Sequence, residues 1–129
     1  MLNDLRRLTK RVQFLHAARG ARVGKPSFSL QMANTQMGGL PVSDNVISVE
    51  KPGIGFTVTK KTGNSPERNR IKRRLRAAVL TCAELFEPQH DYVLIGRRRA
   101  LKTPFAELVS ELEKALARIH SNRPSAQRT

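Results

Sequence analysis

The chain has 129 residues, and its 24 Lys and Arg residues outweigh 10 Asp and Glu residues to give a formal net charge of +14. A chain of this length fits one domain, and a surface this basic attracts polyanions such as nucleic acid or an anionic membrane. Residues 27–43 lie in the longest uncharged stretch and contain glycines, a proline and several polar residues, so this stretch cannot span a bilayer. No secretory signal is visible, and a single cysteine excludes an internal disulfide framework, so we expect a cytoplasmic protein.

The N-terminal part of the chain predicts a short helix followed by a strand. The helix covers residues 9–19, with Thr9 as its N-cap and Gly20 at its end. Residues 27–32 then alternate strictly between apolar and polar side chains, which predicts a half-buried strand. The side chains expected to face inward are Phe28, Leu30 and Met32.

Residues 34–45 have the composition of a loop, residues 47–49 are long enough for a brief strand, and residues 53–60 alternate again. In this last strand the inward-facing side chains are Ile54, Phe56 and Val58. The outward faces of the two alternating strands carry glycine and polar residues. Two such faces predict a sheet with one side left uncovered by the core.

A second helix has clear signals at both ends. Ser65 is a good N-cap, Pro66 suits the first helical position, and Pro88 stops the helix. Its apolar residues recur at the spacing of a core-facing stripe. They are Ile71, Leu75, Ala78, Cys82 and Leu85. Because Cys82 lies on this stripe and no basic or histidine neighbour suits an activated thiol, we expect a core residue and not a nucleophile.

A compact apolar strand at residues 91–96 and a helix opened by Thr103 and Pro104 complete the predicted elements. The apolar face of that helix contains Phe105, Leu108, Val109, Leu112, Leu116 and Ile119. The two strands that flank the second helix should be parallel, since a helical crossover joins them. The prediction is one domain of α+β or α/β sandwich type over residues 1–120, with a polar tail at residues 121–129 that we expect to be disordered.

The second helix also carries a one-sided run of basic residues. They are Arg68, Arg70, Lys72, Arg73, Arg74 and Arg76, and Lys60 and Lys61 extend the run. The one acidic residue among them is Glu67. Like charges at helical spacing repel each other, so such a face is unfavourable unless a polyanion neutralises it. The run therefore predicts a nucleic-acid interface in preference to a merely solvated face, and it does not distinguish RNA from DNA.

Other reactive side chains give weaker patterns. The three histidines, at positions 16, 90 and 120, share no metal-ligand spacing, so no metal site is predicted. The ten carboxylates include no clustered pair on which a two-metal nuclease could be built. Residues 97–99 are three consecutive arginines, and they fit a second RNA contact and a solvated loop equally well.

Residues 53–64 read Gly-Ile-Gly-Phe-Thr-Val-Thr-Lys-Lys-Thr-Gly-Asn, and residues 67–76 read Glu-Arg-Asn-Arg-Ile-Lys-Arg-Arg-Leu-Arg. A strand ending in Lys-Lys, a Gly-Asn turn and a helix that opens with Arg-Asn-Arg-Ile-Lys-Arg resemble the signature of the bacterial ribonuclease P protein component. The likeness extends over residues 8–120. A block of this length makes the resemblance specific, and the alternative is a ribosomal-type structural RNA-binding protein, which would share the charge but not the block.

The resemblance implies an αβββαβα sandwich with a small mixed sheet and a left-handed crossover between its parallel strands. It also implies the protein subunit of an endoribonuclease in which an RNA subunit is the catalyst and binds most of the Mg²⁺, so no protein catalytic residue is expected. The expected partners are that catalytic RNA and precursor tRNA, from which the 5′ leader is removed. No membrane and no obligate protein partner is expected.

In this family a basic helix binds the RNA subunit. The corresponding residues here are Arg68, Asn69, Arg70, Lys72, Arg73 and Arg76, extended by Lys60 and Lys61. A cleft between the first helix and the open sheet face holds the leader, and by position its residues are Phe14, Gln31, Thr57, Thr59 and Lys61. Without the resemblance, Phe14 fits a core position better. Family members often have a second aromatic residue four positions later, where this chain has Ala18, so weaker stacking is expected.

Overall fold

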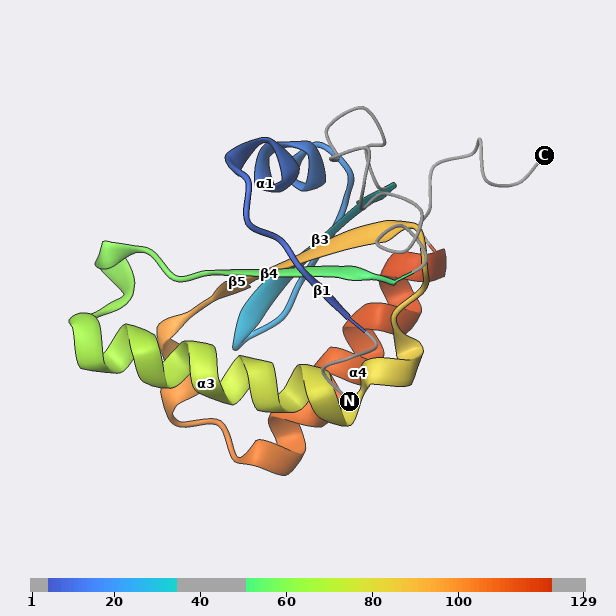
Figure 1. The fold of residues 1–129 in the computed structure, drawn as a ribbon. Helices are drawn as coiled ribbons and strands as arrows, with labels where there is room; N and C mark the ends of the chain where they lie inside the picture. Colours follow the sequence, from blue (N-terminus) through green and yellow to red (C-terminus); the bar gives the residue numbers. More distant parts are fainter. Residues whose placement is uncertain (1–4, 35–50, 122–129) are drawn as a thin grey trace.

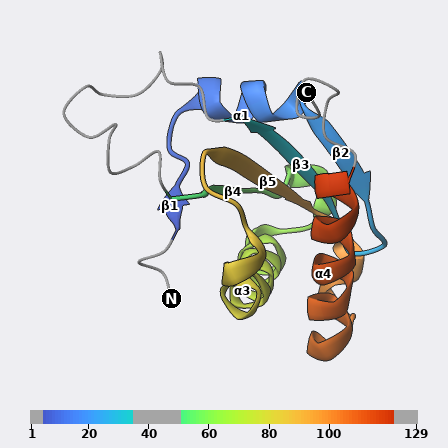
Figure 2. The ribbon, with the colours of Figure 1, turned by 90° about the vertical axis from the view of Figure 1, so that its right-hand side faces the viewer.

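The computed structural model describes residues 5–34 and 51–121, which form a single α+β domain around one five-stranded sheet. Figures 1 and 2 show α1 on one face of the sheet and α3 and α4 on the other. The strands are β1 (Arg6–Arg7), β2 (Ala21–Gly24), β3 (Phe28–Asn34), β4 (Gly53–Thr57) and β5 (His90–Gly96). The helices are α1 (Arg11–Ala18), α3 (Ser65–Thr81) and α4 (Phe105–Ser121), with three short 3₁₀ helices, η3 (Lys60–Thr62), η4 (Ala83–Leu85) and η5 (Arg98–Leu101).

The sheet is mixed, and its strand order is β1-β4-β5-β3-β2. β1, β4 and β5 are parallel to one another, whereas β3 is antiparallel to both β5 and β2. α3 connects β4 to β5, and these two strands are parallel, as predicted for strands joined by a helical crossover. Seen along these strands in Figure 2, the chain passes from β4 beneath the sheet through α3 and back up to β5 in a left-handed turn. The fold class implied by the resemblance is therefore confirmed.

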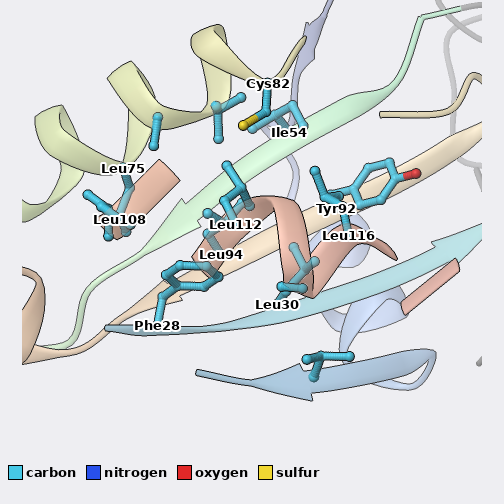
Figure 3. Close-up of a cluster of buried hydrophobic side chains, with 14 of the residues drawn as sticks. Phe28, Leu30, Ile54, Leu75, Cys82, Tyr92, Leu94, Leu108, Leu112 and Leu116 are labelled. Carbon is cyan, nitrogen blue, oxygen red and sulfur yellow. The ribbon is translucent and has the colours of Figure 1, made fainter. Parts of the chain in front are cut away.

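The main core fills the space between the sheet and the two long helices (Figure 3). β3 and β4 contribute the predicted inward side chains Phe28, Leu30, Met32 and Ile54, Val58 follows directly after β4, and Phe56 packs at the border of the cluster. The helices contribute Ile71, Leu75, Ala78, Cys82, Leu108, Leu112, Leu116 and Ile119. Because each large apolar side chain stabilises the fold by about 1.5–3 kcal/mol on burial, this packing holds α3 in place despite its many like charges.

Two residues assigned to apolar stripes lie outside the core. Leu85 is 45% exposed and Phe105 is 42% exposed. α3 ends at Thr81, well before Pro88, and the chain then enters η4, so Leu85 no longer continues the helical stripe. Phe105 is the first residue of α4, one turn before Leu108, which is the first residue of the helix in the core.

The start of α1 also differs from the prediction. Lys10, and not Thr9, is the residue before the helix. The side-chain oxygen of Gln13 accepts hydrogen bonds from the backbone N–H groups of both residues, each at 3.0 Å. The N-terminal end of α1 is thus capped by a glutamine side chain in the first turn, and not by the predicted threonine hydroxyl.

Neither β1 nor β2 was among the predicted strands. β1 is two residues long and is held by Arg6, which donates to the carbonyl oxygen of Lys51 at 2.8 Å and to Asp91 Oδ1 at 2.6 Å. β2 pairs with β3 and places Val23 in the core, so it supplies a third strand between α1 and α3.

The brief strand predicted at residues 47–49 lies outside the described residues. So does the loop from residue 35 onward and the tail from residue 122.

The face of the sheet that was predicted to be uncovered is partly covered by α1. Leu8, Ala17 and Val93 form a small buried cluster there, and Phe14 and Ile95 pack at its border. The main core leaves this face uncovered, as predicted, but the periodicity gave no sign of the cover by α1, because this helix is short and its apolar residues do not follow one helical stripe.

Candidate nucleic-acid interface

α3 begins with a reciprocal cap. Asn64, one residue before the predicted cap Ser65, accepts a hydrogen bond from the backbone N–H of Glu67 at 3.0 Å, and Glu67 Oε1 accepts the Asn64 N–H at 3.0 Å. Arg98, which follows β5, donates to both carboxylate oxygens of Glu67 at 3.1 and 2.8 Å. The Arg98 contact first, and the helix cap second, hold the pKa of Glu67 below its usual range. The acidic residue beside the basic run is therefore paired with Arg98 and not with the cations of α3.

The outer face of α3 is cationic and open. Five of the residues expected to bind RNA are exposed there: Asn69, Arg70, Lys72, Arg73 and Arg76. Within the part of the chain that the structure describes, no carboxylate lies at ion-pair distance from these four cations. A polyanion can therefore bind this face, which we call the cationic face of α3, without breaking an internal ion pair.

Two other arginines of the run have internal partners. Arg68 is partly buried and donates to the carbonyl oxygen of Gly63 at 3.1 Å and to Ser65 Oγ at 3.0 Å. Arg74 donates to backbone carbonyl oxygens at and just beyond η5, namely those of Ala100, Leu101 and Thr103. Arg68 thus braces the turn before α3, and Arg74 joins α3 to η5.

Thr59, Lys60 and Lys61 lie beyond the end of β4, which stops at Thr57, and not on the strand as predicted. The two lysines belong to η3, and all three residues are exposed. The carbonyl oxygen of Thr62 in η3 accepts a hydrogen bond from Arg98 at 3.1 Å, which ties this segment to the loop after β5. The lysines therefore lie between the end of β4 and the first turn of α3.

On the other face of the sheet, Phe14 projects from α1 onto β4. Its ring is half-buried, and a Cβ added at Gly55 would lie 2.6 Å from its Cε2. Gly55, Val93 and Gln31 are direct neighbours across β4, β5 and β3, and α1 packs over this row. Gln31 is only 6% exposed, so the structure places this predicted cleft residue largely beneath neighbouring groups.

The next row on the same face is more open. Its open part is Thr57 and Ile95, which are neighbours in β4 and β5 and are half-buried, whereas Ser29 of β3, the third residue of the row, is buried. Ser29 accepts a hydrogen bond from exposed Arg22 of β2 at 3.3 Å. Sequence reasoning missed Ile95 because its strand read as wholly apolar, and it missed Arg22 because four residues gave too little alternation for a strand. Together with Phe14, these residues lie on the face of the sheet that carries α1.

Three further sets of residues were considered in the sequence: the arginine triplet, Ala18 and Cys82. All three arginines of the triplet are exposed, and Arg98 is bound to Glu67. Ala18 is exposed at the end of α1. Cys82 is buried in the core, as predicted, and this burial raises the pKa of its thiol to about 11.

Two further properties concern metals and membranes. Within residues 5–34 and 51–121, no three His, Cys, Asp or Glu side chains are grouped so that they could hold a metal ion. The helices in the same ranges are too short or too polar to cross a membrane.

Comparison with known proteins identifies the family. The family model described as Ribonuclease P matches residues 2–120. The ribonuclease P protein component of Ruegeria pomeroyi is 40% identical over 119 residues, covering 91% of this chain and 88% of the relative. That of Paramagnetospirillum magneticum is 41% identical over 125 residues, covering 92% and 86%.

Solved structures support the same fold. The RNase P protein of Staphylococcus aureus aligns with a TM-score of 0.66 and 23% identity, covering 86% of this chain and 92% of that one. The RNase P protein of Thermotoga maritima aligns with a TM-score of 0.67 and 21% identity, covering 88% and 96%. With a family match over nearly its whole length and relatives of about 40% identity, the chain belongs to the ribonuclease P protein family.

Proposed function

We propose that the protein is the protein subunit of ribonuclease P and that two of its surfaces hold two different RNAs. The cationic face of α3, with Arg68, Lys60 and Lys61 beside it, binds the catalytic RNA subunit. The observation that carries this proposal is that four exposed cations of α3 have no acidic partner among the described residues. Such a face is unfavourable alone and favourable against a phosphate backbone, from which it releases counterions.

The cleft between α1 and the sheet is proposed to hold the 5′ leader of precursor tRNA. Phe14 offers a half-buried aromatic surface for one base, and the hydroxyls of Thr57 and Thr59 with the ammonium of Lys61 lie along the end of β4. Leaders differ in sequence, and one stacking side chain with backbone electrostatics binds single strands without reading their bases. Gln31 is proposed to support the floor of the cleft, since it is almost fully covered.

We assign the chemistry to the RNA subunit. Mg²⁺ would be held mainly by that RNA, because the described residues of this chain group no three side chains that could ligate a metal ion. The protein's residues then bind and orient: α3 fixes the protein on the catalytic RNA, and the cleft fixes the leader relative to α3. Correct placement of a substrate is itself a large part of catalysis. We place this activity in the cytoplasm.

The test is reconstitution of the holoenzyme. A bacterial ribonuclease P RNA with Mg²⁺ at low salt is expected to cleave precursor tRNA at the mature 5′ end more efficiently when the protein is added. Rigorously RNA-free protein is expected to leave the same substrate intact. Cleavage by the protein alone would contradict the proposal. RNA binding without any effect on leader removal would support the ribosomal-type alternative instead.

A further inference from the structure

A pocket of about 300 Å³ lies at the edge of the sheet, between β1, β4 and α3. Most of its lining is apolar and consists of Leu5, Leu8, Phe14, Ile54, Gly55, Phe56, Val79 and Leu80. Three further lining residues are exposed cations, Arg7 on β1 and Lys72 and Arg76 on α3. The pocket is therefore an apolar hollow bordered by positive charge.

The pocket exists because β1 is too short to cover β4. β1 pairs with β4 at Gly53 and Ile54, Leu8 donates to the Ile54 carbonyl oxygen at 2.9 Å, and the chain then leaves for α1. Ladder groups of a strand alternate in direction, so the N–H and C=O of Phe56 face the same edge as those of Ile54. β1 does not extend to them. The pocket thus offers a backbone donor and acceptor beside its apolar wall.

The charges around the pocket select an anion. None of the lining residues is acidic. The fourth lining cation, Arg6, is bound to Asp91 at 2.6 Å, so Arg7, Lys72 and Arg76 are the cations that remain for a ligand. The guanidinium of Arg76 lies 5.9 Å from the centroid of the Phe56 ring, which joins charge and aromatic surface in one wall. An apolar hollow with a cationic rim fits a flat ring that carries a phosphate.

We propose that this pocket binds one unpaired nucleotide of RNA, with the base against Phe56 and Leu80 and the phosphate near Arg7, Lys72 and Arg76. Its lining includes cations of the cationic face of α3 at one side and Phe14 of the cleft at the other, so it connects the two surfaces around the edge of β4. The choice of RNA rests on the proposed function. The assignment of a nucleotide site to the sheet edge, with Arg7, Phe56 and Leu80 as its residues, goes beyond it.

The test is a titration of the full-length, ¹⁵N-labelled protein, followed by NMR. The probes are adenosine 5′-monophosphate, adenosine and inorganic phosphate at low salt. The nucleotide is expected to shift the amide signals of Leu8, Gly55, Phe56 and Leu80 with one saturable curve. Phosphate alone is expected to shift signals near the cationic rim and to leave Gly55 and Leu80 unchanged. Identical shifts with nucleotide and phosphate would overturn the proposal and would indicate anion binding only.

Two substitutions with matched controls test the two halves of the pocket. Phe56→Leu keeps the apolar wall but removes the ring, and it should weaken nucleotide binding at least about fivefold while phosphate binding stays the same. The control Phe105→Leu changes an exposed phenylalanine on α4, outside the pocket lining. Arg7→Gln should weaken the nucleotide about two- to fivefold. The control Arg118→Gln, at an exposed position on α4, should not.

If Phe56→Leu and Phe105→Leu bind the nucleotide with equal affinity, and circular dichroism shows that both are folded, the base does not contact Phe56. This result would overturn the proposal. These titrations use the protein without the catalytic RNA. A negative titration would therefore contradict the nucleotide site without contradicting leader removal by the reconstituted holoenzyme. A negative reconstitution would contradict the proposed function without changing the titration result.

Discussion

The ring of Phe14 in α1 rests directly on the backbone of Gly55 in β4. A Cβ at position 55 would lie 2.6 Å from Cε2 and 2.7 Å from Cζ of that ring, and 3.2 Å from Cδ1 of Leu8. Real Cβ atoms do not approach other atoms this closely, so any side chain at position 55 must displace Phe14. The glycine therefore sets how closely the aromatic ring approaches β4.

Gly55→Ala is expected to lift Phe14 away from β4 and to lower the free energy of unfolding by about 1–3 kcal/mol, as overpacking does. Leader affinity should fall with it. Gly24→Ala is the matched control, because a Cβ at position 24 meets its nearest atom, in Arg97, at an ordinary 3.5 Å. Thermal unfolding and binding of precursor tRNA measure both effects. An alanine at position 55 that leaves both quantities unchanged would show that Phe14 moves freely.

Phe14→Ala separates a cleft residue from a core residue. If Phe14 stacks on a leader base, the substitution should weaken binding of precursor tRNA by about 1–3 kcal/mol and leave mature tRNA unaffected. A ring that served only as core would instead cost about 3–5 kcal/mol of stability and weaken both tRNAs alike. Because Phe14 is half-buried at the border of a small cluster, we expect the first pattern with a modest loss of stability. Phe14→Leu, which keeps most of the packing, controls for that loss.

The long elements of the fold were predictable because each buries a regular stripe. Alternation in β3 and β4 and the stripes of α3 and α4 named most of the core correctly. β1 was not predictable, because a strand of two residues is too short to show an alternating pattern. It is held in place by hydrogen bonds from Arg6 to Lys51 and Asp91. The stripes failed at Leu85 and Phe105, where the helix had ended or had only begun.

The site was predictable to the extent that it depends on charge. A run of exposed cations follows from sequence alone, but the structure alone reveals that Arg68 and Arg74 have internal partners. The surroundings of the proposed cleft residues were less predictable, because α1 packs on this face of the sheet and its docking leaves no periodic pattern. This is why Gln31 was expected to be open and is almost buried.

Arg70 and Arg73 are expected to drive assembly with the RNA subunit. In a plot of log K against log salt concentration, each phosphate contact makes the slope more negative by roughly 0.7 to 0.9. The double variant Arg70→Ala with Arg73→Ala should therefore flatten that slope by about one to two units. The fold should stay intact, because both side chains are exposed. Lys114→Ala with Arg118→Ala removes the same charge from the exposed face of α4 and is the matched control. Equal slopes for the two double variants would contradict a specific role for α3.

Arg74 is expected to behave in the opposite way to its neighbour Arg73. Its guanidinium donates to carbonyl oxygens of Ala100, Leu101 and Thr103, so Arg74→Ala leaves these acceptors without their donor. Loss of such partly buried bonds should lower the free energy of unfolding by about 1–3 kcal/mol, whereas Arg73→Ala should be near neutral. Chemical denaturation of the two variants measures the difference. A stable Arg74→Ala protein with lost RNA affinity would instead assign Arg74 to the interface.

The pair of Glu67 and Arg98 predicts a dependence on pH. Glu67 has its pKa lowered in the folded protein, first by Arg98 and then by the cap at Asn64. A carboxyl group with a lowered folded pKa stabilises the fold above its unfolded pKa, and this contribution is lost as the pH falls through the folded value, below about pH 4. Arg98→Ala should raise the pKa of Glu67 towards its ordinary value and reduce that acid dependence. Titration of the carboxyl carbon by NMR measures the pKa directly, with Arg99→Ala as the control, since Arg99 is an exposed neighbour in the same triplet. An identical Glu67 titration in both variants would mean that the cap alone, without Arg98, sets the pKa.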